Sequence, residues 1–340
     1  MKKELSLKKI ILIPAVFLFL ILQGCNLDNE NIIEPPPVSE TGMWFVSRFN
    51  ANGDARFVKG YSINGIPYAF LADGNNGLEI INISDPSNPA QTFNYNTSGN
   101  VCEVFIDSIN GRKYAYLSDL NEGLFIINVS NPSAPLFNSN ISYAGGVNSV
   151  NIKNGYLYTA LVQGGMKVFN INNLPDTVIE VFTYTPAHPV EHIEISGNTL
   201  FMTEGNSGLE LANIMNPSSP VYLSLFNSQG RCNDVKIGGN LAYIANGDAG
   251  ICIANVTNPA IPFLVATGSG NADVRGIDYS PNFLFTAEYG EGAEVFNLFN
   301  PSNPDPLGYF EPQGNCYSVH YFRGKVLIAN GQYGLLILRF

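Results

Sequence analysis

Basic residues are scarce in this sequence. Its 340 residues include 17 Lys and Arg against 28 Asp and Glu, a formal net charge of −11 at pH 7. Proteins that bind nucleic acids neutralise the phosphate backbone with clustered Lys and Arg. We therefore expect no nucleic-acid partner.

Histidines and closely spaced cysteines are also few. His188 and His192 have the four-residue spacing that suits zinc on a helix. They begin an expected strand, however, where this spacing does not bring two imidazoles over one ion. We expect no metal site. The remaining thiols match no small disulfide scaffold or Cys-x-x-Cys motif, and we interpret them as buried, unpaired side chains: Cys102, Cys232, Cys252 and Cys316.

Familiar catalytic signatures are missing. The sequence shows no Gly-x-Ser-x-Gly elbow, P-loop or dinucleotide fingerprint, so no catalytic residue and no cofactor are assigned. Several loop carboxylates lack the alternating spacing of an EF-hand. We expect them to form a solvated acidic rim: Asp73, Asp119, Asp248, Glu288 and Glu291.

The first residues predict an export signal. Four Lys precede Ile10–Leu22, an apolar run of 13 residues that is too short to cross a bilayer comfortably. The following Leu22-Gln23-Gly24-Cys25 resembles the lipobox of bacterial lipoproteins. That resemblance implies a signal peptide over 1–24 and a lipid on Cys25. An ordinary signal peptide that is cut nearby is the alternative.

The segment after this signal is expected to be a tether. Residues 25–42 are acidic and contain three consecutive prolines, Pro35–Pro37, so they cannot form a core. After removal of 1–24 the chain retains 13 basic and 27 acidic residues, a net charge of −14. We expect a protein of the bacterial cell envelope, attached to the outer membrane through its N-terminal lipid.

The rest of the sequence is a repeat. A short motif that begins with Gly, such as GLEIINISDPSNP at 77–89, recurs at intervals of 42 to 46 residues. A constant period of this size is typical of propellers and solenoids. Its seven copies begin at Gly77, Gly123, Gly165, Gly208, Gly250, Gly292 and Gly334.

Each copy predicts four strands. Two strand-like segments precede the Gly, an apolar strand follows it, and a weaker strand comes after a proline-containing turn. Four strands in about 42 residues are the size of a propeller blade. The fifth residue after the Gly is Asn in six copies, which we interpret as a turn-forming residue: Asn82, Asn128, Asn170, Asn213, Asn255 and Asn297.

The two ends of the repeat predict how the ring closes. The sequence stops at Phe340, directly after the third strand of the seventh copy, whereas 43–49 is strand-like and precedes the first copy. Supplying the missing outer strand from 43–49 would remove an exposed edge. The sequence thus predicts an all-β fold over 43–340, a seven-bladed β-propeller.

The repeated motif resembles the LVIVD repeat, whose signature runs roughly Gly-Leu-x-Ile-x-Asp-Val-Ser-Asp-Pro. The resemblance extends over about 43–340, with Asn where that family has Asp. It implies a β-propeller of bacterial or archaeal surface proteins, often lipoproteins. It implies no catalytic motif and therefore supplies no site residues.

The candidate binding rim lies where the inner strands begin. These positions vary between copies while the framework repeats, as expected of a surface that interacts. Glu191, His192, Asp234 and Arg275 bring charged groups to the channel mouth, as a polar pocket, an acid–base pair or a salt-bridged rim. The whole candidate set is Glu103, Glu191, His192, Asp234, Arg275 and Tyr317.

Three functions remain open at this point. The first is a membrane-anchored binding or scaffold module for an envelope protein or a surface polymer such as a glycan. The second is a hydrolase or lyase acting on a carbohydrate or lactone at the channel mouth. The third is an architectural role without a discrete ligand. The missing catalytic signature favours the binding module.

Overall fold

The computed structural model describes residues 42–142, 145–186, 188–268 and 273–340. The predicted signal peptide (1–24), the lipidated Cys25 and the tether up to residue 41 lie outside the described residues. Within the described part, no helix is long and apolar enough to span a bilayer.

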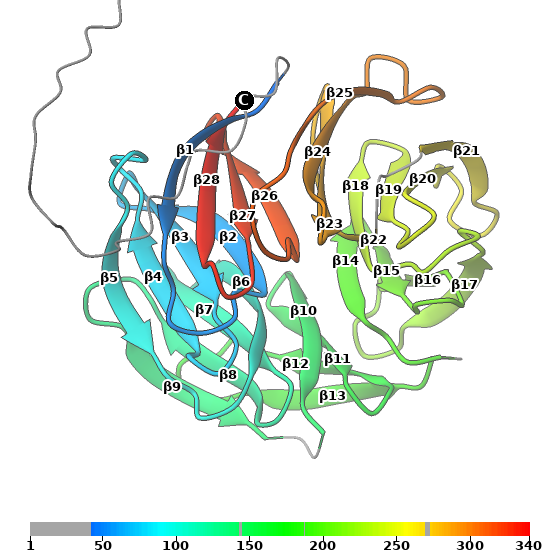
Figure 1. Cartoon of the computed structure of the whole chain (residues 1–340). Coiled ribbons are helices and arrows are strands. Elements are labelled where there is room, and N and C mark those ends of the chain that lie inside the picture. The colour runs from blue at the N-terminus through cyan, green and yellow to red at the C-terminus, as the bar shows by residue number, and fades with distance from the viewer. Residues whose placement is uncertain (1–41, 143–144, 187, 269–272) are drawn as a thin grey trace, which may run out of the picture. The chain divides into compact units, whose positions relative to one another are not determined.

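Twenty-eight strands form seven antiparallel sheets of four strands each, ordered from the inner to the outer edge (Figure 1). Blade one contains β2 (Phe57–Ile63), β3 (Ile66–Ala72), β4 (Leu78–Asn82) and β5 (Ala90–Tyr95); blade two contains β6 (Val101–Ile109), β7 (Arg112–Asp119), β8 (Gly123–Asn128) and β9 (Leu136–Ile141). Blade three contains β10 (Val147–Lys153), β11 (Tyr156–Leu161), β12 (Met166–Asn170) and β13 (Ile179–Tyr184); blade four contains β14 (His192–Ser196), β15 (Thr199–Thr203), β16 (Leu209–Asn213) and β17 (Val221–Phe226).

Blade five contains β18 (Asp234–Gly238), β19 (Leu241–Ala245), β20 (Ile251–Asn255) and β21 (Phe263–Gly268); blade six contains β22 (Asp273–Ser280), β23 (Phe283–Tyr289), β24 (Gly292–Asn297) and β25 (Asp305–Phe310). Blade seven contains β26 (Ser318–Phe322), β27 (Lys325–Ala329), β28 (Leu335–Arg339) and, as its outer strand, β1 (Trp44–Phe49).

The predicted ring closure is confirmed. β1 pairs antiparallel with β28, from Trp44 opposite Arg339 to Phe49 opposite Leu335. Figure 1 shows β1 in blue beside β28 in red. The strand begins one residue later than expected, because Met43 is buried in the apolar cluster of blades six and seven. The fold is therefore a seven-bladed all-β propeller.

The core is divided among the seven interfaces between blades. Inner strands contact one another in the order β2, β6, β10, β14, β18, β22, β26 and back to β2. One apolar cluster fills each interface, as where Phe70 and Leu78 of blade one meet Val104 and Leu117 of blade two. The apolar runs of the sequence follow from this, because each sheet is buried on both faces.

The Gly that opens each repeat is required by its backbone conformation. All seven have a positive φ, from +76° at Gly334 to +112° at Gly292. A Cβ at Gly77 would lie 2.1 Å from the carbonyl oxygen of Tyr95 on the neighbouring strand. Only Gly adopts this conformation at so close an approach.

The recurring Asn residues form turns, as predicted. In all six copies the Asn Oδ1 accepts a hydrogen bond from the backbone N–H two residues later, for example 2.9 Å from Ser84 N to Asn82. The residue before the proline does the same in five copies, as at Asp85 and Asn258. The variant turn of the third copy contains a cis peptide bond between Leu174 and Pro175.

These connections define two faces of the ring. The mouth face carries the loops between the second and third strands of each blade and the first residues of the inner strands. The turn face carries the hairpin turns between the first and second strands and the proline turns between the third and fourth strands. Every inner strand runs from the mouth face to the turn face.

Candidate functional site

The channel mouth is lined by the first residues of the inner strands. A cavity of about 140 Å³ opens there. Isolated bridges such as Gly74 with Val101, and Gly205 with Cys232, tie the start of a blade to the mouth loop of the preceding blade and hold these positions at one level. All six residues of the predicted rim line the cavity: Glu103, Glu191, His192, Asp234, Arg275 and Tyr317.

His192 lies at the centre of this group. Its Nε2 is 3.4 Å from Glu103 Oε1, and its Nδ1 is 3.2 Å from Asp234 Oδ1. The three side chains are buried rather than solvated, since the residues are only 4 to 9 % exposed. Burial opposes a charge on the imidazole, but Asp234 and Glu103 together raise the pKa of His192. The arrangement favours an imidazolium held between two carboxylates.

Glu191 and Arg275 have partners outside the predicted group. Glu191 Oε1 lies 2.7 Å from Arg231 Nη2, and Arg275 Nε lies 2.7 Å from Asp273 Oδ2. The four residues expected to converge therefore separate: His192 and Asp234 meet inside the channel, whereas Glu191 and Arg275 belong to its outer edge. Arg231 and Asp273 were not predicted from the sequence, because no motif or repeated position marks them as site residues.

Two tyrosines and a third ion pair complete the outer edge. Tyr289 and Tyr317 pack edge to face, with ring centroids 5.3 Å apart. The Arg275 guanidinium lies 3.7 Å from the Tyr289 centroid, and that of Arg56 lies 4.6 Å from the Tyr317 centroid. Arg56 also pairs with Asp54 at 2.6 Å. The edge thus carries three acid–arginine pairs in fixed positions.

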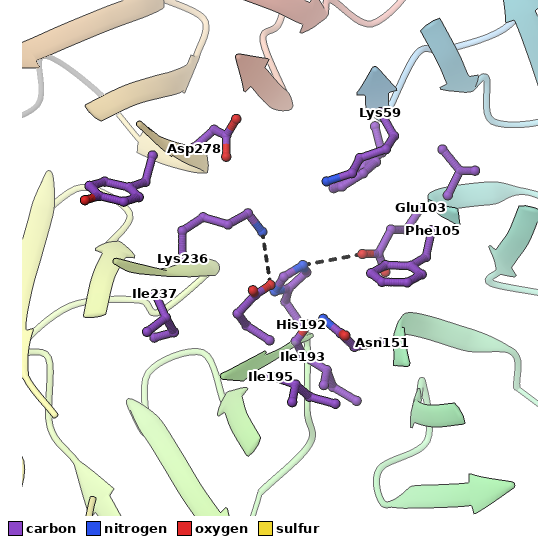
Figure 2. A pocket seen from close by; sticks show the side chains of 14 residues that line it. Lys59, Glu103, Phe105, Asn151, His192, Ile193, Ile195, Lys236, Ile237 and Asp278 are labelled. Atoms are coloured by element: carbon purple, nitrogen blue, oxygen red, sulfur yellow. Dashed lines mark hydrogen bonds and ion pairs between the residues drawn. The ribbon is translucent and has the colours of Figure 1, made fainter. Parts of the chain in front are cut away.

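A second layer of charge lies deeper in the channel. A cavity of about 400 Å³ is lined by Lys59, Glu194, Lys236 and Asp278, among others. Figure 2 shows Lys59, Lys236 and Asp278 pointing toward one another across it. Lys236 Nζ is 3.3 Å from Asp234 Oδ1 and 3.7 Å from Glu194 Oε2. Glu194 and Lys236 stand two positions after the predicted His192 and Asp234 on the same strands, so strand alternation was the signal that would have found them. Asp278 follows Arg275 by three positions across an irregularity of β22, and β2, which carries Lys59, held no predicted residue.

The charged groups of this layer differ in whether their pKa shifts favour the charged or the neutral form. Burial opposes charge on Lys236, yet Asp234, Glu194 and Asp278 raise its pKa well above the ordinary value. Burial, together with Lys236, lowers the pKa of Lys59. Burial raises the pKa of Asp278, while Lys59 and Lys236 oppose that rise. Burial opposes charge on Asp234, but Lys236 and His192 lower its pKa. In this layer the pKa shifts of Lys236 and Asp234 therefore favour their charged forms, whereas those of Lys59 and Asp278 favour the neutral forms.

Most polar side chains of the channel also connect the blades. Each inner strand is the edge of its sheet, and its free N–H groups donate to side chains of the preceding blade. The pairs are Val150 N to Glu103 Oε2 (3.1 Å), Ile193 N to Ser149 Oγ (3.1 Å), Ile277 N to Asp234 Oδ2 (3.1 Å), Tyr321 N to Asp278 Oδ2 (2.6 Å), Val58 N to Ser318 Oγ (3.4 Å) and Gly60 N to His320 Nδ1 (3.0 Å).

The expected solvated rim of loop carboxylates is wrong for three of its five members. Asp73, Asp119 and Glu288 are buried, whereas Asp248 and Glu291 are exposed. Asp119 shows the reason. Its carboxylate accepts hydrogen bonds from the N–H groups of Asn100, Asn121 and Glu122 and from the Thr97 hydroxyl, so it organises the loop instead of facing water.

Blades four and six each bury a pair of carboxyl groups near the mouth face. Glu204 and Glu210 are 4 % and 1 % exposed, and the Tyr184 hydroxyl donates to Glu210. Burial and Glu210 raise the pKa of Glu204 to about 8. Burial and Glu288 raise the pKa of Glu294 likewise to about 8. One carboxyl of each pair therefore holds a proton at neutral pH.

The remaining thiols and histidines form no metal centre among the described residues. His188 is exposed while His192 is buried, so the two are not partners. Cys232, Cys252 and Cys316 are free and buried, as predicted, but Cys102 is only partly buried. Burial raises the pKa of Cys252 and of Cys316 to about 12, which keeps both thiols protonated.

Comparison with protein families supports the motif assignment. The model of the LVIVD repeat matches residues 62–97, 99–142 and 229–267. The chain contains LVIVD repeats. The matched segments fall in blades one, two and five, and the same strands and turns recur in the blades between them. No curated protein matches the chain in sequence.

Solved structures share the fold of this LVIVD-repeat chain at low identity. The WD40 β-propeller domain of Doa1 is similar with a TM-score of 0.69 and 13 % identity, covering 88 % of this chain and 97 % of that one. The computationally designed Ika8 protein is similar with a TM-score of 0.64 and 8 % identity, covering 88 % of this chain and all of that one. These similarities concern the fold alone.

Proposed function

We propose that this protein is a binding module of the bacterial envelope. In this proposal a lipid on Cys25 holds it at the outer membrane, and its mouth face binds an envelope protein. The observation that supports a protein partner is the outer edge of the mouth, where Arg56, Arg231 and Arg275 stand in ion pairs and the guanidinium groups of Arg56 and Arg275 also lie over the rings of Tyr317 and Tyr289. Arg and Tyr in fixed positions are the residue types that dominate binding energy at interfaces.

The edge is suited to reversible recognition because its groups are half exposed. The side chains of Arg56, Arg231 and Arg275 are 36, 53 and 38 % exposed. Such groups can make new hydrogen bonds without leaving a buried charge unpaired. Hydrogen bonds between the blades hold the propeller together beneath this edge, so the loss of conformational entropy on binding is small.

In-cell crosslinking tests this proposal. Photo-reactive residues placed at Asn75 and Asn206, in the mouth loops, are expected to capture a discrete envelope protein. Replacing Arg56, Arg231 and Arg275 with Ala should reduce that capture about tenfold or more. A control variant, Asp176→Ala with Asp305→Ala at exposed positions of the turn face, should capture as much as the wild type. Equal capture by both variants would exclude the mouth edge as the binding surface.

A hydrolase or lyase acting on a carbohydrate or lactone is the second candidate. The specific observation in its favour is the His192 imidazole between Glu103 and Asp234, a geometry that could move a proton. The same two carboxylates also hold the next blade through Val150 N and Ile277 N, which explains their presence without catalysis. Turnover of a glycan or lactone panel that is abolished by His192→Gln, with the fold retained, would establish the enzyme.

A further inference from the structure

The exposed apolar side chains of the propeller gather on one face. Of the 16 large hydrophobic residues that are exposed in the described part of the chain, 13 lie at the turn face, in the proline turns, the hairpin turns or the first two residues of the outer strands. They are Trp44, Phe45, Ile66, Leu136, Phe137, Ile179, Met215, Val221, Tyr222, Ile261, Phe263, Leu264 and Phe299.

This apolar belt runs around most of the ring. Phe299 is 74 % exposed, Met215 72 %, Ile261 69 % and Leu136 65 %. These four residues come from blades six, four, five and two. Exposed apolar residues that are scattered need no explanation, but a set that recurs on one face from blade to blade marks an interaction surface.

Positive charge accompanies the belt. Six of the 13 Lys and Arg residues that follow the predicted signal peptide lie at the turn face: Arg112, Lys113, Lys153, Arg323, Lys325 and Arg339. They outnumber the four carboxylates in the proline turns and at the starts of the outer strands: Asp85, Asp176, Glu180 and Asp305. The carboxylates of the channel mouth and of the buried pairs lie at the opposite end of the strands. In a chain as acidic as this one, the turn face is thus the surface least repelled by an anionic partner.

The chain enters the propeller at this same face. Trp44 pairs with Arg339 at the end of β28 that lies farthest from the mouth loop Gly331–Gly334. The segment between Cys25 and β1 therefore joins the ring at the belt. Its length of 18 residues allows about 60 Å of reach, so the tether alone would not hold the ring against a membrane.

From these observations we infer that the turn face rests on the surface of a phospholipid bilayer. The apolar belt enters the interface, the Arg and Lys side chains meet anionic headgroups, and the mouth face points away from the membrane. This inference rests on the lipid anchor proposed above, and it makes no use of a ligand at the mouth.

The single Trp of the chain provides the test, because Trp44 lies in the belt and is 41 % exposed. The lipidated protein is reconstituted into vesicles of phosphatidylethanolamine and phosphatidylglycerol, with and without brominated acyl chains. We expect a shift of Trp44 emission to shorter wavelength and quenching by the brominated lipid. Phe137→Ser with Phe263→Ser, on blades two and five, should lower that quenching by about half or more.

A matched variant controls for stability. Leu225→Ser with Tyr309→Ser changes two exposed residues nearer the mouth end of their strands, and it should be quenched like the wild type. Unchanged emission on reconstitution would overturn the inference, as would wild-type quenching in the belt variant. Self-association that only the belt variant abolishes would also overturn it and assign the belt to a second copy. Labelling of Cys25 with radioactive palmitate reports separately on the anchor.

Discussion

The mouth face and the turn face are built from the same repeat, but they use their side chains differently. On the turn face the Asn residues that cap the proline turns recur from blade to blade, and exposed apolar residues surround them. On the mouth face the residue near the start of the inner strand changes from blade to blade, from Glu103 to His192 to Asp234. Positions that are repeated in every blade serve folding, whereas positions that vary serve the connection of blades or recognition.

Within the mouth face a second division follows depth. The buried layer around His192 accepts backbone N–H groups and holds adjacent blades together. The outer edge, with Arg231 and Arg275, makes no such backbone contacts among the hydrogen bonds found in the described residues. Stability and binding should therefore be separable by substitution, even though His192 and Arg275 line one cavity.

The largest expected effect distinguishes a buried carboxylate of the channel from an exposed one on the turn face. Asp234→Ala removes the partner of His192 and the nearer partner of Lys236, whose buried ammonium keeps only Glu194 at 3.7 Å, and should cost about 3–5 kcal/mol of unfolding free energy. Asp85→Ala removes only a turn hydrogen bond at an exposed site and should cost about 1 kcal/mol or less. Urea unfolding of both variants measures the difference; equal losses would contradict the division.

The second effect concerns pH and the carboxyl pairs of the mouth face. The folded pKa of Glu204 and of Glu294 is about 8, above the ordinary value of 4.5. The folded state therefore binds these protons more tightly, and the stabilisation is complete below pH 4.5 and is lost as pH rises toward about 8. The urea midpoint should fall over that range. Glu204→Gln with Glu294→Gln should flatten the decline.

A turn-face carboxylate supplies the control for this pH dependence. Asp305 is exposed at the start of β25, and Asp305→Asn should leave the pH profile of the urea midpoint unchanged. If that variant flattens the profile as much as the double Gln variant does, the buried pairs are not its cause.

The smallest effect tests the repeated capping residue. Asn255→Ala removes the acceptor of the Thr257 N–H, 3.0 Å away, and should lower the unfolding free energy by about 1 kcal/mol. Asn303→Ala, an exposed residue of the last proline turn, should change it by only a few tenths. Thermal unfolding resolves the two, and a neutral Asn255→Ala would show that the cap is dispensable.

The architecture could be predicted from the sequence because the four-strand pattern of a blade occurs in seven copies, one for each blade. The Gly at each strand start indicates a backbone with positive φ, and the Asn at each turn indicates a side chain that accepts a hydrogen bond from the turn. Both structural roles can therefore be read from the residue type. The N-terminal strand was predictable because the last copy lacked an outer strand. The residues at the channel mouth were predictable as a group, because they occupy the same position in successive copies of the repeat.

The partners within that group could not be predicted. Whether Glu191 meets Arg275 or Arg231 depends on side-chain reach across two blades, which the repeat does not encode. Burial of Asp119 was missed because a loop carboxylate appears solvated until the N–H groups that surround it are located. Lys59 and Asp278 were not predicted, because they lie deeper along the inner strands than the mouth positions that the repeat makes visible, and β2, which carries Lys59, held no candidate residue.

Ring closure has a consequence for how the chain reaches its folded state. Among the described strands β1 is synthesised before all others and its partner β28 after all others, so Trp44 and Phe45 wait unpaired until β28 has been made. Bringing such distant segments together is the slow step of topologies dominated by non-local pairing. Blades one to six have all their strands beforehand, and the protein becomes a closed ring only in a final docking event, during which its first strand is the part most exposed to capture by other chains.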